Sequence, residues 1–192
     1  MKSLISTIVL TLFSVASYAN ATEFPAYQSE VVAANLKRPW AVSVLPDNSL
    51  IISEMSGQIR LFKGGLLSEP LSGVPKVYQQ GQGGMLDVRP HPQFSQNQWV
   101  YFSYATGDIN ANALRLSRAK LIGNELQQLE QLITIAPLKD TPVHYGGRIA
   151  FLPDNSLLVT TGDGFDFREK AQTLDNLLGK IIRLNDVSIL SE

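Results

Sequence analysis

The chain has 192 residues, of which 44% are apolar, and it has a formal net charge of −1 and no cysteine. The lack of cysteine excludes a disulfide framework, so stability must come from packing. No basic stripe is present, which argues against nucleic acid as a partner. Beyond the first residues, no stretch is long and apolar enough to predict a membrane span.

The beginning of the sequence predicts a signal peptide. Lys2 precedes an apolar run at residues 4–15, and Ala19-Asn20-Ala21 supplies the small-x-small pattern of a cleavage site. The apolar run is too short for a transmembrane helix. We therefore expect residues 1–21 to direct export to the periplasm or the medium, and residues 22–185 to form the mature domain.

Short apolar runs then alternate with turn residues, which is typical of antiparallel strands. Predicted strands occupy residues 41–44, 50–53, 58–62, 85–88, 99–104, 115–121, 148–151, 157–161 and 180–184. Residues 125–132 and 169–178 are predicted to form helical turns between strands. The absence of longer amphipathic helices argues against a parallel α/β fold.

An internal repeat indicates how the strands are organised. Residues 45–53 recur almost unchanged as residues 152–160, and Pro46, Pro90 and Pro153 mark equivalent points of three units. Repeats of this size with several strands each are typical of a β-propeller. We predict an all-β fold of propeller type with about three blades in this chain, and a β-sandwich is the alternative.

His144 is the first candidate for chemistry. It lies in the segment His144-Tyr145-Gly146-Gly147-Arg148, just before a predicted inner strand, where propeller loops converge on the axis. An imidazole there can act as a general base, and the paired glycines allow a flat molecule to approach the backbone. The alternative is a surface histidine in a glycine-rich turn.

Other polar residues occupy similar turns. Gln82 lies in the equivalent lead-in of the preceding unit, and its amide can donate and accept hydrogen bonds to orient a carbonyl-rich ligand. Tight-turn packing is the alternative for that segment. His91 is interpreted as structural. Asp163 and Asp166 are interpreted as turn caps rather than as calcium ligands, and no metal site is predicted from the residues.

Taken together, these motifs resemble the soluble glucose/sorbosone dehydrogenase family of quinoproteins, and especially its periplasmic aldose sugar dehydrogenases. The resemblance rests on residues 38–41, 81–88, 91–94, 144–148 and 178–185. It implies a six-bladed propeller that binds pyrroloquinoline quinone (PQQ) with calcium. It also implies oxidation of the C1 hydroxyl of an aldose to a lactone, with electrons passing to a soluble acceptor.

The same resemblance implies roles for individual residues. His144 is the expected catalytic base, which takes the sugar hydroxyl proton as hydride moves to the quinone. Gln82 is expected to contact the cofactor or the sugar beside it. Val143 stands where the glucose dehydrogenase branch has an aspartate, so the sugar-contacting carboxylate of that branch is missing here.

The end of the sequence departs from the family pattern. Family members continue beyond the strand at residues 180–184 through an Asp-Gly turn and then for as many residues again, and that second half supplies the cationic PQQ partners and the calcium ligands. Residues 186–192 are interpreted as an aberrant tail, so we expect a truncated chain that is inactive alone. The alternative function is a non-catalytic exported propeller module that binds a saccharide or a protein, with a homodimer closing the ring.

Overall fold

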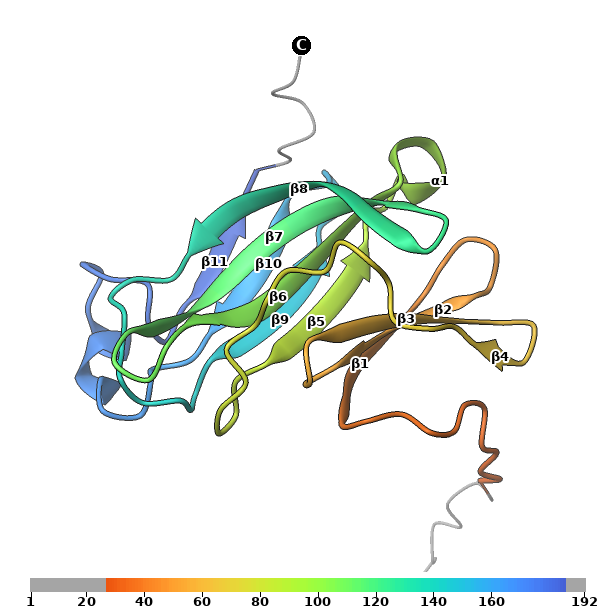
Figure 1. Cartoon of the computed structure of the whole chain (residues 1–192). Coiled ribbons are helices and arrows are strands. Elements are labelled where there is room, and N and C mark those ends of the chain that lie inside the picture. Colours follow the sequence, from red (N-terminus) through yellow and green to blue (C-terminus); the bar gives the residue numbers. More distant parts are fainter. Residues whose placement is uncertain (1–26, 186–192) are drawn as a thin grey trace, which may run out of the picture. The chain divides into compact units, whose positions relative to one another are not determined.

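The computed structural model describes residues 27–185, so the predicted signal peptide (residues 1–21) and the predicted tail (residues 186–192) lie outside the described residues. The chain divides into two compact units, Met1–Val31 and Val32–Glu192. The described part of the first unit has neither helix nor strand, and all described strands belong to the second (Figure 1). Over residues 27–185, no helix is long and apolar enough to cross a membrane.

The described residues of the second unit form three antiparallel sheets, each a meander whose strands are ordered as in the sequence. The first sheet contains β1 (Pro39–Val44), β2 (Leu50–Glu54), β3 (Gln58–Lys63) and β4 (Leu66–Leu67). The second contains β5 (Met85–Pro90), β6 (Trp99–Gly107), β7 (Asn112–Ile122) and β8 (Glu125–Thr134). The third contains β9 (Gly146–Phe151), β10 (Leu157–Thr161) and β11 (Ile181–Leu184). Two short helical segments, α1 (Phe94–Asn97) and the 3₁₀ turn η1 (Arg168–Gln172), lie between strands.

The sheets follow one another through their first strands. Strand β5 contacts β1 and β2 on one side and β9 on the other (Figure 1). Meander sheets that pack in succession, each with its first strand beside the next, form the blade arrangement of a β-propeller. The predicted all-β propeller type with about three blades in this chain is therefore confirmed.

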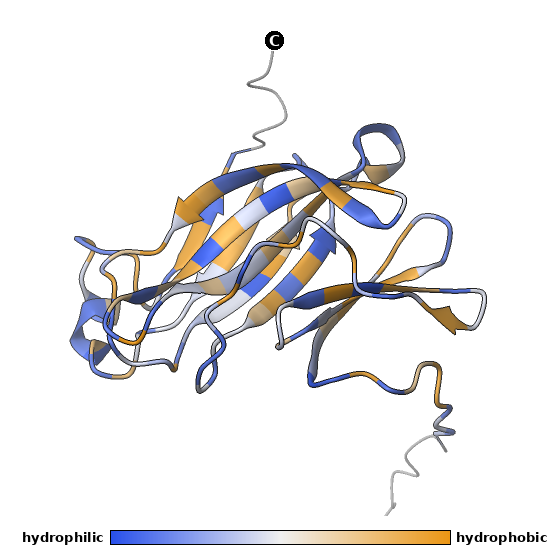
Figure 2. Cartoon of the chain, in the orientation of Figure 1, coloured by the Kyte–Doolittle hydropathy of each residue, from blue (hydrophilic) through white to orange (hydrophobic). Residues whose placement is uncertain are grey.

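The middle sheet is buried on both faces. On β6, Phe102 and Tyr104 belong to the core between the first and second sheets, whereas Tyr101 and Ala105 belong to the core between the second and third. Successive side chains of a strand point to opposite faces, so a strand covered on both sides needs an almost continuous apolar run. On the outer strand β8, apolar and polar residues are mixed instead, as the bands of colour in Figure 2 show.

The prediction of helical turns at residues 125–132 was wrong, because this segment forms most of the outer strand β8. Strand β8 pairs with β7 through a two-residue turn at Gly123 and Asn124, a connection typical of β-hairpins. Leu126 is buried between exposed Glu125 and Gln127, which is the period of a strand. In the sequence, the three-residue spacing of Leu126, Leu129 and Leu132 and the high helix propensity of Glu, Gln and Leu favoured a helix instead. The other predicted segment, residues 169–178, is confirmed only where η1 covers it.

The two copies of the repeat have the same turn. Asn48 and Asn155 adopt left-handed backbone conformations, with φ of 64° and 63°, which asparagine tolerates better than branched residues do. In each copy the preceding aspartate, Asp47 or Asp154, accepts hydrogen bonds from the N–H and hydroxyl of the serine two residues later. Each copy of the repeat therefore forms the turn that connects the first strand of its sheet to the second.

A buried carboxylate joins the first strands of the second and third sheets. Asp87 on β5 has no exposed surface, and it accepts hydrogen bonds from the backbone N–H of Val88 at 2.9 Å and of Ile149 on β9 at 2.8 Å. The guanidinium groups of Arg89 and Arg148 lie 3.3 and 3.6 Å from the same carboxylate. The negative charge of Asp87 is thus compensated by one arginine from each strand, Arg89 on β5 and Arg148 on β9.

Arg148 extends this connection to the first sheet. Its guanidinium carbon lies 3.9 Å from the ring centroid of Trp40 on β1, a cation–π contact. Ser103 of β6 adds a further link, because its hydroxyl donates to the carbonyl of Gly147 at 2.6 Å. One polar network therefore fixes the relative positions of β1, β5 and β9.

Replacing Asp87 by alanine should lower the free energy of unfolding by about 2–4 kcal/mol, because two buried N–H groups lose their acceptor. Urea denaturation followed by circular dichroism measures this loss. Glu69→Ala, which removes a carboxylate from an exposed loop, is the control and should leave the unfolding midpoint unchanged. A midpoint for Asp87→Ala equal to that of wild type would contradict the role given to the network.

Candidate active site

The structure brings His144 and Gln82 together. His144 lies in the loop before β9, and Gln82 lies in the loop before β5. The backbone N–H of His144 donates to Oε1 of Gln82 at 2.9 Å, and the N–H of Gln82 donates to the carbonyl of Pro142 at the same distance. The two residues selected from the sequence are thus hydrogen-bonded neighbours, although they are far apart in the chain.

A third loop, which follows β10, packs against the backbone of His144. Gly162 begins this loop, and a Cβ atom at this position would lie 1.9 Å from the carbonyl oxygen of His144, so only glycine fits. The N–H of Gly162 donates to the carbonyl of Tyr145 at 2.9 Å. His144 itself has a φ of 51°, an uncommon conformation for a residue with a side chain.

Asp163 orients the imidazole ring of His144. Its Oδ1 lies 2.8 Å from Nδ1 of His144 and accepts the backbone N–H of Phe165 at 2.9 Å. The hydrogen bond from Phe165, followed by that from His144, holds the pKa of Asp163 below its usual range. An ionised carboxylate only accepts hydrogen bonds, so Nδ1 carries a proton and Nε2 of the neutral ring is an acceptor.

The opposite side of the ring is open. The side chain of His144 is 40% exposed, and within residues 27–185 no hydrogen bond to its Nε2 is formed. The ring of Phe165 packs edge-on against the imidazole, with 5.3 Å between centroids, and Arg168 stacks on Phe165 at 4.3 Å. The arrangement presents one proton-accepting nitrogen at the surface of the loops.

The sequence analysis identified Asp163 only as a turn cap. It does cap the turn at Phe165, but the pairing with His144 was missed. The signal that predicts the pairing is strand order: β9 and β10 are antiparallel neighbours, with Gly146 opposite Thr161. Residues just before β9 and just after β10 must therefore meet at one end of the sheet.

The other titratable candidates do not extend the site. His91 is buried, its Nδ1 accepts the N–H of Gln93 at 3.0 Å, and its ring packs on Phe151 with 5.4 Å between centroids, so the structural interpretation of His91 is confirmed. Asp166 is exposed. Across the described residues, no group of three or more His, Cys, Asp or Glu side chains is placed to hold a metal ion.

A cleft of about 400 Å³ lies beside Gln82. It combines a guanidinium, an indole, an amide and glycine backbone, and its lining residues are Arg38, Trp40, Met55, Gly81, Gln82, Leu86, Tyr145 and Gly146. The indole of Trp40 is held by the stacked guanidinium of Arg148. The cleft therefore offers a flat apolar surface and a cation next to the loop that carries His144.

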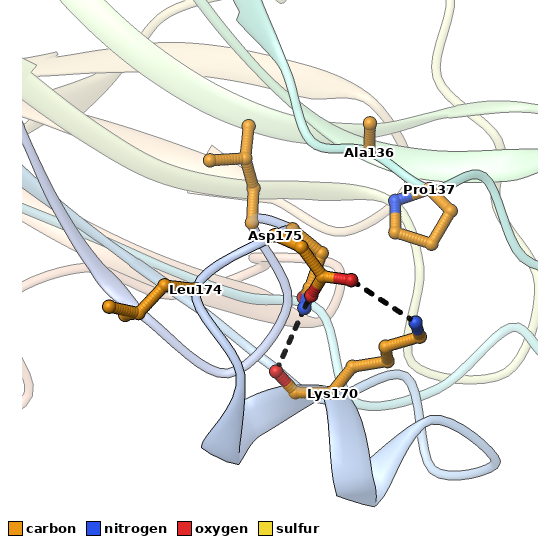
Figure 3. A pocket seen from close by; sticks show the side chains of 7 residues that line it. Ala136, Pro137, Lys170, Leu174 and Asp175 are labelled. Atoms are coloured by element: carbon orange, nitrogen blue, oxygen red, sulfur yellow. Dashed lines mark hydrogen bonds and ion pairs between the residues drawn. The ribbon is translucent and has the colours of Figure 1, made fainter.

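Another cavity, of about 520 Å³, is formed by residues 136–137, 170 and 174–177 (Figure 3). Lys170 and Asp175 form an ion pair of 3.7 Å at this cavity, and the side-chain amide of Asn176 donates to the carbonyl of Lys170 at 3.0 Å. Neither His144 nor Gln82 lines it. Gln82 and the two residues after His144, Tyr145 and Gly146, line the cleft described above, so we place the candidate active site there.

The three successive meander sheets define a protein of the β-propeller class. The model of the glucose/sorbosone dehydrogenase family matches residues 36–191, and the chain belongs to this family.

Similar proteins include aldose sugar dehydrogenase YliI of Escherichia coli (strain K12), which is 37% identical over 163 residues that cover 82% of this chain and 43% of YliI. The crystal structure of the soluble aldose sugar dehydrogenase of Escherichia coli in the apo-form has a TM-score of 0.76 at 36% identity, covering 82% of this chain and 46% of that one. The PQQ-bound aldose sugar dehydrogenase of Streptomyces coelicolor has a TM-score of 0.69 at 28% identity, covering 81% and 47%. The chain thus spans less than half the length of these relatives.

Replacing Asp163 by alanine should change the tautomer of His144. In wild type we expect the neutral ring to carry its proton on Nδ1, and in Asp163→Ala we expect a large fraction on Nε2, because the acceptor is gone. The ¹⁵N NMR shifts of the two ring nitrogens report this directly, and His91 is the only other histidine. Asp166→Ala removes a carboxylate of the same loop and should leave the tautomer as in wild type. A ring that keeps its Nδ1 proton in Asp163→Ala would refute the assignment.

Proposed function

We propose that this chain contributes the general base, His144, to an active site that oxidises the C1 hydroxyl of aldoses to lactones with PQQ as cofactor. One observation carries the proposal: Oδ1 of Asp163 lies 2.8 Å from Nδ1 of the 40% exposed His144 side chain, and the two residues after His144 line the cleft beside Gln82. Membership of the glucose/sorbosone dehydrogenase family supports it, as do relatives named as aldose sugar dehydrogenases, one of them bound to PQQ.

The cleft fits one side of a planar polycyclic acid such as PQQ. Arg38 can pair with a carboxylate, and Trp40 offers a flat surface. When bound, PQQ supplies a two-electron acceptor for hydride. For calcium the fit is different: because residues 27–185 contain no cluster of three metal-ligating side chains, we assign no step of the reaction to calcium on this chain.

The chemistry assigned to the protein is proton transfer and orientation. As the C1–H bond of the aldose breaks with loss of hydride, Nε2 of His144 takes the proton of the C1 hydroxyl, and the C1–O bond becomes the lactone carbonyl. Asp163 stabilises the imidazolium that forms. Because Oε1 of Gln82 accepts the N–H of His144, the NH₂ end of the same amide is available to a ligand oxygen.

The setting of this reaction is also proposed. The pattern of residues 1–21 supports export to the periplasm or the medium, where a soluble acceptor would take the electrons.

The second candidate function is a non-catalytic binding module that completes its ring with another copy of the chain. Exposed apolar side chains on the first and last strands support it: Val42 and Val44 on β1 are 54% and 61% exposed, and Ile181 on β11 is 71% exposed. Such surfaces favour association. Light scattering that gives a discrete dimer, together with saccharide binding that survives His144→Ala, would favour this function over catalysis.

PQQ binding can be followed by tryptophan fluorescence, because the chain has only two tryptophans, Trp40 and Trp99. Trp40 lines the cleft, whereas Trp99 is buried in the core. We expect PQQ to quench the emission of Trp99→Phe, which retains Trp40, and to leave Trp40→Phe unquenched. Equal quenching of the two variants would place PQQ outside the cleft and contradict the proposed function.

Turnover tests whether the chain is sufficient. With PQQ, calcium, glucose and a dye acceptor, we expect the chain alone to give no dye reduction, because Arg38 is the only cationic side chain among the residues lining the cleft and the described residues lack a calcium-ligand cluster. Escherichia coli YliI is the positive control. If the chain does turn over, His144→Ala should lower the rate at least about 100-fold, as for loss of a general base. Turnover that survives this substitution would exclude His144 as the base.

A further inference from the structure

Lys139 is a buried lysine that the proposed chemistry does not use. It is 3% exposed, and its ammonium donates to Oδ1 of Asn112 at 3.0 Å and to the backbone carbonyl of Thr141. It also lies 3.7 Å from the ring centroid of Tyr145. No acidic side chain of the described residues forms an ion pair with it, and burial lowers the pKa of Lys139 to about 8. A buried charge is costly, so such a lysine has a structural or functional reason.

Lys139 connects the two loops that carry His144 and Asp163. Thr141 belongs to the first loop, and the hydroxyl of Thr141 donates to the carbonyl of Gly164 in the second at 2.7 Å. The aliphatic stem of Lys139 packs on Gly164, where a Cβ atom would lie 2.7 Å from Cδ of the lysine. The N–H of Gly164 in turn donates to the carbonyl of His144 at 3.3 Å.

Lys139 and His144 also line the same small cavity. Its volume is about 10 Å³, which leaves room for at most one water molecule. Tyr145 lines it too, and burial raises the pKa of Tyr145 well above its usual range, so its hydroxyl stays protonated and donates to Oδ1 of Asn112 at 2.6 Å. The amide oxygen of Asn112 therefore accepts from both Lys139 and Tyr145, and water cannot easily replace either donor.

We propose that Lys139 is a positioning residue for the His144–Asp163 pair. Its ammonium ties the carbonyl of Thr141 to Asn112, and its stem holds Gly164 in place, so that the carboxylate next to Gly164 meets Nδ1 of His144. The catalytic meaning of this arrangement rests on the proposed function, but the arrangement itself does not. The lysine acts through the loops and touches neither the ligand cleft nor the exposed Nε2.

Lys139→Met keeps the stem and removes the charge and the donors. In this variant we expect the ¹⁵N shifts of His144 to move towards those of Asp163→Ala. We also expect amide exchange at Gly164 to become about tenfold faster, because hydrogen bonds to a charged donor are lost. Lys180→Met is the matched control, since Lys180 also donates to backbone carbonyls, at 2.6–3.2 Å from those of Lys170, Ala171 and Leu178. It should leave the tautomer of His144 unchanged.

A Lys139→Met protein that keeps the Nδ1 proton of His144 overturns the inference. Should this variant fail to fold, wild type gives the answer by titration. The amide shifts of Thr141 and Gly164 should then follow the Cε signal of Lys139, with a midpoint at a pH of about 8. The other charged groups that act here are Asp140 on Lys139 and Arg168 on Asp163. Amides that do not respond while Lys139 titrates also overturn it.

These measurements need neither PQQ nor a sugar, so they separate the two proposals. A changed tautomer in Lys139→Met together with no quenching of Trp40 by PQQ would support the positioning role and contradict the proposed function.

Discussion

The buried carboxylate of Asp87 is the interaction on which the rest of the structure depends. It accepts the N–H of Ile149, and its charge is compensated by Arg89 and Arg148. If the first strands of the two sheets slid past each other, a buried charge or a buried N–H group would be left without its partner. Strand β9 begins at Gly146, two residues after His144. The position of β9 therefore fixes the end of the loop that carries His144.

The site is built from loops that a rigid set of strands brings to one end, and each loop has a separate task. The loop before β5 supplies Gln82, which holds the backbone of His144. The loop after β10 supplies Asp163, which selects the tautomer, and Gly162, which lets the two loops touch. The buried Lys139 connects the two loops through Thr141 and Gly164. Loops carried by a fixed scaffold are where chemistry is usually found in proteins.

The sequence predicted the parts of this structure that depend on local pattern. The period-two runs gave the inner strands, the Leu-Pro-Asp-Asn repeat gave the shared turn, and comparison of the segments before equivalent strands selected His144 and Gln82. Strand β8 was missed because its residues favour helices when considered without β7 beside them. The pairing of Asp163 with His144 and the burial of Lys139 depend on contacts between loops distant in sequence, and only the strand order brings those loops together.

The central claim is that the cleft beside Gln82 receives the cofactor and that Nε2 of His144 faces it. A crystal structure of the chain with PQQ tests this most directly. We expect the ring system of PQQ to lie against Trp40, with His144 still hydrogen-bonded to Asp163 through Nδ1 and its Nε2 directed towards the bound quinone. PQQ in the cavity formed by residues 136–137, 170 and 174–177, or an imidazole turned away from Asp163, would contradict it.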